Sequence, residues 1–159
     1  MREKFRDGYT LIELMVVMAI VGILFTIGYT NFQDYSRQQT LLSVVRTLQT
    51  DINSTREFAI AGNKPNGCNG LLNGYQFNVI SSSTYVISAN CTPNNNIEIK
   101  QISVAQGVIL TPSNPNPVIF KSVAGGTNIQ TGANATIIIT QTLSGNSKSI
   151  IIGANGNVK

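Results

Sequence analysis

The sequence predicts an α+β protein in which one long N-terminal α-helix packs on an antiparallel β-sheet domain. Three observations support this fold class. The first proline is Pro65, so nothing breaks a helix over the first sixty residues. Apolar residues dominate residues 11–32 and then recur at spacings of three and four. From Gly74 onward, short β-branched runs alternate with turn clusters, as in an antiparallel sheet.

The first half of the expected helix has the composition of a membrane span. Residues 14–32 carry no charge, and at about 1.5 Å per residue they extend roughly 29 Å, close to the hydrocarbon thickness of a bilayer. A buried core helix is the alternative, but soluble helices are rarely apolar around their whole circumference. Arg2, Lys4 and Arg6 precede the run and predict that residues 1–8 stay in the cytoplasm, with the chain after Phe32 outside it.

A secretory signal peptide also begins basic and continues apolar. It ends in a small-residue cleavage site, whereas here the helical pattern continues past Gly22 and Gly28. The sequence therefore favours a retained helix.

The second half of the helix is amphipathic and is expected to dock on the sheet, because a coiled-coil seam would be too short. The helix should extend from about Thr10 to Ala61, since Gly62 and Pro65 form a stop signal. Its apolar stripe comprises Leu41, Val45, Leu48, Ile52 and Ala59, with Thr55 in the remaining slot. Charged residues are assigned to the other faces, namely Arg37, Arg46, Asp51, Arg56 and Glu57.

Seven strands are expected in the remainder of the chain, with the last two forming a hairpin around Gly145-Asn146. Serine, proline, asparagine and glycine clusters separate them. The predicted strands are residues 75–80, 84–89, 97–104, 108–111, 118–121, 135–143 and 149–152.

Composition argues against an enzyme, a metal site or a cofactor. The chain contains no histidine, so the common general base and the common metal ligand are both missing. Cys68 and Cys91 do not have a metal-ligand spacing, and in an exported domain an isolated pair is most simply a disulfide. Two unrelated buried thiols are the alternative. No catalytic residue is assigned.

Glu13 is the unusual residue of the apolar segment. A carboxylate carried to the centre of a membrane costs about 2.5–3.5 kcal/mol, and a plain anchor would be better served by leucine. Glu13 therefore needs a partner.

The segment GYTLIELMVV (residues 8–17) resembles the class III signal of type IV pilins and pseudopilins, usually G-F-T-L-I-E-L. The resemblance implies a pilin fold, cleavage between Gly8 and Tyr9 by a membrane prepilin peptidase, and N-methylation of Tyr9. It also implies that Glu13 pairs with the N-terminal amine of a neighbouring subunit. Tyr9 replaces the usual Phe, a difference of one hydroxyl, and Thr30 stands where many relatives have proline.

The same resemblance divides the chain into a leader (1–8), a transmembrane and polymerisation half-helix (9–32), an amphipathic half-helix (33–62) and an exported β-rich domain (63–159). It implies as partners other pilin or pseudopilin subunits, the peptidase, an inner-membrane assembly platform and, before assembly, membrane lipid. The chain is then expected in the bacterial cytoplasmic membrane and afterwards in a pilus or pseudopilus.

A second segment, residues 54–63, resembles the helix end of the GspH/FimT minor pseudopilins. Cys68 and the closing Gly156-Asn157-Val158 also fit that class, while Thr55 and the missing serine before Glu57 depart from it. The resemblance favours a minor subunit of a type II secretion or type IV pilus system. A major type IV pilin is the alternative.

Some GspH/FimT relatives bind DNA through basic residues near the C-terminus, which makes DNA uptake a further alternative. Here Lys148 and Lys159 are scattered, although phosphate binding needs clustered cations. Lys64, Lys100 and Lys121 would have to converge in space; otherwise they are isolated solubilising charges.

Overall fold

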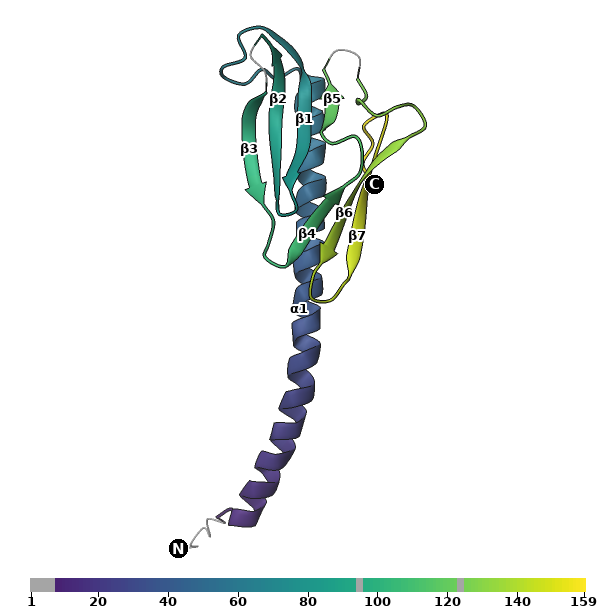
Figure 1. The fold of residues 1–159 in the computed structure, drawn as a ribbon. Helices are drawn as coiled ribbons and strands as arrows, with labels where there is room; N and C mark the ends of the chain where they lie inside the picture. Colours follow the sequence, from purple (N-terminus) through teal and green to yellow (C-terminus); the bar gives the residue numbers. More distant parts are fainter. Residues whose placement is uncertain (1–7, 94–95, 123–124) are drawn as a thin grey trace, which may run out of the picture. The chain divides into compact units, whose positions relative to one another are not determined.

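The computed structural model describes residues 8–93, 96–122 and 125–159, without the side chains of residues 27, 28, 30 and 31. The chain divides into two compact units, Met1–Ser36 and Arg37–Lys159. The helix α1 (Leu11–Ala61) is followed by seven strands in the described part of the chain (Figure 1). The α+β class and the long N-terminal helix are confirmed.

Helix α1 begins and ends at the signals that the sequence contains. The Thr10 side chain accepts a hydrogen bond from the Glu13 backbone N–H at 3.3 Å, which caps the first turn. At the other end Gly62 has a φ of 61°, a left-handed conformation that glycine adopts without strain. The N–H groups of Gly62 and Asn63 bond to the Ala59 and Phe58 carbonyls and close the last turn. The predicted length of the helix is correct to within one residue.

The strands form two antiparallel sheets. The first has the order β3-β2-β1-β5, and the second has the order β4-β6-β7. The bounds of the first sheet are β1 Leu71–Ser81, β2 Thr84–Thr92, β3 Ile97–Ser103 and β5 Val118–Lys121. Those of the second are β4 Val108–Pro112, β6 Asn134–Gln141 and β7 Ser147–Gly153, and β6 and β7 form the predicted hairpin.

Strand β1 begins four residues earlier than the predicted strand, which started at Tyr75. Its register with β2 shifts between Leu72 and Gly74, so the alternation of buried and exposed residues is interrupted there. A Cβ at Gly74 would collide with the Phe120 carbonyl oxygen of β5. Glycine at this position lets the two strands approach, and the interruption hid the first part of the strand from the sequence pattern.

The core of Arg37–Lys159 lies between the distal part of α1 and the two sheets. Leu41, Leu48, Ile52 and Ala59 are buried, as predicted, and Val45 is partly buried against the same core. Val44 joins them. The hydroxyl of buried Thr55 donates to the Asp51 carbonyl at 2.6 Å, so this polar residue needs no partner from the sheet.

The prediction that Asp51 lies on another face of the helix than the docking stripe is wrong. Its side chain is buried, receives a hydrogen bond from the Tyr85 hydroxyl at 2.6 Å, and pairs with Lys100 at 2.9 Å. Buried carboxylates are tolerated when they are paired and hydrogen-bonded. The face that docks on the sheet therefore includes a charged residue whose partners come from β2 and β3.

The predicted disulfide between Cys68 and Cys91 is present, with a Cα–Cα distance of 5.7 Å. Both cysteines are buried. The bond joins the connection after α1 to the end of β2, and it closes the loop that contains β1.

Candidate assembly site

The residues of the class III signal lie at the start of α1, in the unit Met1–Ser36. Thr10 precedes the helix and Glu13 lies in its first turn, in the Thr-x-x-Glu spacing of a capping box. The Glu13 N–H donates to the Thr10 hydroxyl, and the Leu14 N–H donates to the Thr10 carbonyl at 3.2 Å. The Thr-x-x-Glu spacing is a signal by which this helix start can be found in the sequence.

Gly8 and Tyr9 stand outside the helix. Apart from its chain neighbours, no atom of the described residues lies within 4 Å of the position that a Cβ on Gly8 would occupy, and Tyr9 is 84% exposed. The peptide bond between them is thus part of a non-helical segment that makes no packing contact at Gly8. A protease could bind this backbone without first unfolding α1.

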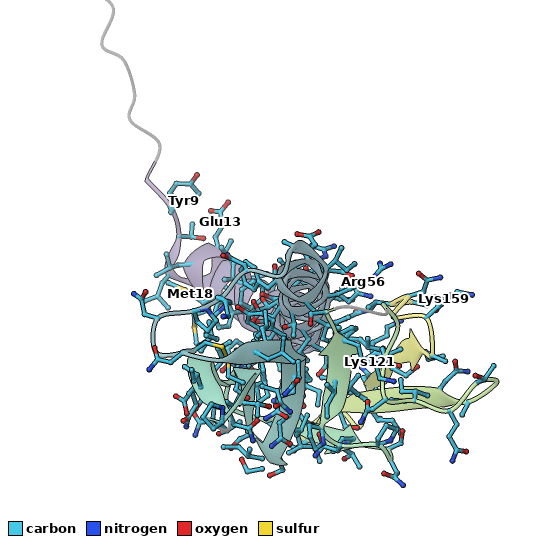
Figure 2. The ribbon with its side chains drawn as sticks, turned by 90° about the horizontal axis from the view of Figure 1, so that it is seen from above. Tyr9, Glu13, Met18, Arg56, Lys121 and Lys159 are labelled. Carbon is cyan, nitrogen blue, oxygen red and sulfur yellow. A yellow bond between two sulfur atoms is a disulfide. The ribbon has the colours of Figure 1, made fainter. Side chains whose placement is uncertain are left out.

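Glu13 is exposed and has no ion pair with any residue that the structure describes. Figure 2 shows Glu13 and Tyr9 at the same end of α1. The N-terminus of a helix attracts negative charge through its unpaired N–H groups. The carboxylate is therefore favourably placed, and none of the described basic side chains is bound to it.

The helix surface that follows is apolar on all sides. Every residue from 11 to 26 is exposed, and Phe25, one of the largest, is 73% exposed. The Thr26 hydroxyl donates to the Gly22 carbonyl at 2.9 Å, so its donor is satisfied within the helix. Continuous apolar surfaces of this extent mark contacts with membrane or protein.

Within the described residues, no helix is long and apolar enough to cross a membrane. Thr30, which stands where many relatives have proline, lies within α1, and its side chain is outside the described set.

Of the three lysines considered as a DNA-binding group, Lys64, Lys100 and Lys121, one is engaged by a carboxylate of the chain itself. Lys100 is bound to both carboxylate oxygens of Asp51, at 2.9 and 3.2 Å, so its charge is compensated. Figure 2 instead shows Lys121 on the same side of its unit as Arg56 and Lys159. This grouping could not be read from the sequence, because the three residues come from α1, β5 and the segment after β7.

Comparison with known proteins bears directly on the start of the helix. Residues 4–29 match the prokaryotic N-terminal methylation motif. Prepilin peptidase-dependent protein D of Escherichia coli (strain K12) is 29% identical over 102 residues, which are 64% of this chain and 60% of that protein. The start of the chain is thus similar to that of type IV pilin-like proteins. Pilin-like proteins are structural rather than enzymatic, in agreement with the prediction from composition.

Further relatives of this chain are similar over shorter segments. A fimbrial protein of Pseudomonas aeruginosa is 45% identical over 42 residues, 26% of this chain and 27% of that protein. Fimbrial protein EcpC of Eikenella corrodens is 51% identical over 35 residues, 22% of this chain and 23% of that protein. The chain thus spans less than two thirds of the length of these relatives. No solved structure matches it significantly.

Proposed function

We propose that the chain is a filament subunit that a prepilin peptidase cuts between Gly8 and Tyr9, that is N-methylated on Tyr9, and that polymerises through α1. The observation that carries the proposal is the exposed Gly8-Tyr9 bond directly before a capped, apolar helix whose first turn presents Glu13. The methylation motif and the printed name of the Escherichia coli relative support it.

Before assembly, residues 9–32 lie in the cytoplasmic membrane, with residues 1–8 in the cytoplasm and residues 63–159 outside. The uncharged run at residues 14–32 and the basic residues before it support this orientation. The disulfide supports an oxidising compartment for the β-rich domain. The inner-membrane assembly platform is the remaining partner that this life cycle requires.

Cleavage gives Glu13 its partner. It creates an amine on Tyr9, and this amine pairs with the Glu13 carboxylate of a neighbouring subunit. Two charges that are each costly in an apolar medium neutralise one another only when the subunits are in the correct axial register. The Glu13 side chain is exposed and has no ion pair among the described residues, so it is available for such a contact.

Two versions of the proposed role differ in how many copies of the chain a filament contains. The helix-end motif at residues 54–63 supports a minor, GspH/FimT-like subunit, whereas the printed names of the fimbrial relatives support a repeating subunit of a type IV pilus. We take the repeating subunit as the proposal, because the fimbrial relatives are 45% identical over 42 residues and 51% identical over 35 residues. Immunoblotting of sheared filaments separates the two, and filaments that lack the chain would contradict the repeating version.

Processing is tested by Gly8→Val. The open space at Gly8 means that valine disturbs no contact in the chain itself. We therefore expect the full-length chain to accumulate uncut, with Tyr9 unmethylated, in mass spectra of the membrane fraction. Normal cleavage of this variant would refute the processing site.

Assembly is tested by Glu13→Leu, with Met18→Leu as the control on the same exposed helix. The Glu13 variant should insert in the membrane and fail to enter filaments, because the carboxylate that sets the register is gone. The Met18 variant should assemble. Equal filament yields from both would remove Glu13 from the mechanism.

A further inference from the structure

A small cavity lies where the end of β5, the distal part of α1 and the segment after β7 meet. Its volume is about 130 Å³. Its lining includes Arg56 from α1, Phe120 and Lys121 from β5, and Asn155 and Gly156 from the segment after β7. Figure 2 shows Arg56 and Lys121 on this flank of the unit Arg37–Lys159.

Arg56 is held against the wall of this cavity. A Cβ on Gly156 would lie 3.3 Å from Arg56 Nε and 3.5 Å from Phe120 Cδ1. Gly156 has a φ of 80°, and the absence of a side chain lets the segment lie flat against the arginine stem. Arg56 is half-buried, so its guanidinium loses less freedom on binding than that of a fully exposed arginine.

The two cations of the cavity lack an acidic partner. Neither Arg56 nor Lys121 forms an ion pair with a residue in the described part of the chain. A guanidinium and an ammonium that face one cavity make a site for a carboxylate or phosphate group. Because one water needs at least about 10–15 Å³, the cavity has room for a carboxylate and accompanying waters.

An unpaired carboxylate lies at the other edge of the same sheet. Glu98 is exposed on β3 and has no ion pair within the described residues. Lys100, two residues further along β3, is bound to Asp51. In the order β3-β2-β1-β5, the strand of Glu98 and the strand of Lys121 are the two edges, as Figure 1 shows.

We propose that Glu98 of one copy of the chain docks in the Arg56/Lys121 cavity of the next copy in the filament. This inference rests on the proposed function as a repeating subunit. A contact between two different surfaces of one subunit can repeat without closing, which is the condition for a helical filament. Complementary charges at such a contact determine which surfaces meet and in which register. The other exposed acid of this unit, Glu57, follows Arg56 directly and so lies near the receiving site.

Charge reversal in the full-length chain tests the contact. Glu98→Lys and Lys121→Glu should each reduce the filaments recovered per amount of cleaved chain by about tenfold, because like charges then face one another. The double variant should recover part of the wild-type yield, because the pair at positions 98 and 121 is restored with its signs exchanged while Arg56 keeps its positive charge. All three side chains changed, including the control Lys148→Glu on β7, are exposed, and the control should assemble normally.

Two results would overturn the proposal: single variants that assemble like wild type, or a double variant no better than the worse single. DNA retardation by the purified chain that Lys121→Glu abolishes, with filament yield unchanged, would assign the cavity to a polyanion instead. The proposed function fails separately, if the wild-type chain is absent from filaments or is not cut after Gly8.

Cross-linking locates the contact directly. A chain carrying both Glu98→Cys and Lys121→Cys should give a ladder of linked subunits when filaments are treated with a short bis-maleimide. Cys68 and Cys91 are joined to each other and do not compete for the reagent. Neither single-cysteine variant should give a ladder, because each subunit then has only one half of the contact. A ladder from a single variant, or none from the pair, would contradict this arrangement.

Discussion

Asp51 shows how a single residue connects the helix to the first sheet. Its carboxylate accepts hydrogen bonds from Tyr85 on β2 and from Lys100 on β3. Tyr85 is itself stacked on Phe77 of β1, with ring centroids 4.9 Å apart. The central strands β1 and β2 and the edge strand β3 are thus connected to one helical position through a buried polar group.

Replacing Asp51 should cost much more than replacing Lys100. Asp51→Ala leaves the buried Tyr85 hydroxyl without its acceptor, and we expect a loss of about 3 kcal/mol in the free energy of unfolding. Lys100→Met removes a side chain that is 50% exposed and should cost at most about 1 kcal/mol. Urea unfolding of both variants in detergent measures the difference. Equal losses would mean that Asp51 acts mainly through the ion pair.

The Tyr85 hydroxyl gives the chain a dependence on alkaline pH. Burial, and then the hydrogen bond to Asp51 and its negative charge, raise the pKa of Tyr85 above its ordinary value. The unfolded chain loses this proton near pH 10 while the folded chain keeps it. Stability from this group is therefore complete below about pH 10 and declines as the pH rises further.

Tyr85→Phe should flatten this decline. The variant has no hydroxyl to ionise, so its melting temperature should fall less steeply between neutral pH and strongly alkaline pH than that of wild type. Some dependence should remain, since burial also raises the pKa of Tyr75. Thermal melts at a series of pH values measure the slopes, and parallel slopes would exclude Tyr85 as the cause.

At the scale of elements, one helix carries two different surfaces. Residues 11–26 are exposed all round, whereas the distal part buries a single stripe that includes Leu41, Leu48 and Ile52. The distal stripe is explained by the sheets that cover it. The first surface is not covered by any described part of its own unit, so its apolar residues are explained by a medium or a partner outside the chain.

Substitution of Gly22 tests whether a neighbouring helix packs against this first surface. Apart from the adjacent helix backbone, no atom of the described residues lies within 4 Å of a Cβ placed on Gly22, so no described contact requires glycine there, and alanine would favour the helix by about 1 kcal/mol. Small residues let neighbouring helices approach closely in an apolar environment. We therefore expect Gly22→Ala to leave processing intact and to lower filament yield, measured by shearing. An unchanged yield would show that no neighbour packs against this position.

At the scale of the whole molecule, the disulfide secures the β-rich domain after the helix. The chain-entropy estimate for a loop of this size is about 3 kcal/mol. Reduction should lower the melting temperature of the wild-type chain, whereas a chain carrying both Cys68→Ala and Cys91→Ala should not respond to the reductant. A wild-type chain indifferent to the reductant would show that the bond does not limit unfolding.

Local patterns were sufficient for the helix, its stop at Gly62, the positions of the seven strands and the signal around Gly8, Tyr9 and Glu13. Helix caps, turn residues and alternation act between residues a few positions apart, so they can be read along the chain. The early start of β1 was not predicted, because the register of this strand with β2 shifts between Leu72 and Gly74.

Only the tertiary structure decided the order of the strands in two sheets, the burial of Asp51 and the gathering of Arg56 with Lys121. Asp51 meets Tyr85 and Lys100 across 34 and 49 residues of sequence. Such pairs depend on which strands become neighbours, and strand order leaves no periodic trace in the sequence. The sequence by itself determined where the long apolar helix begins, and the fold determined which side chains of the domain come together on its surface.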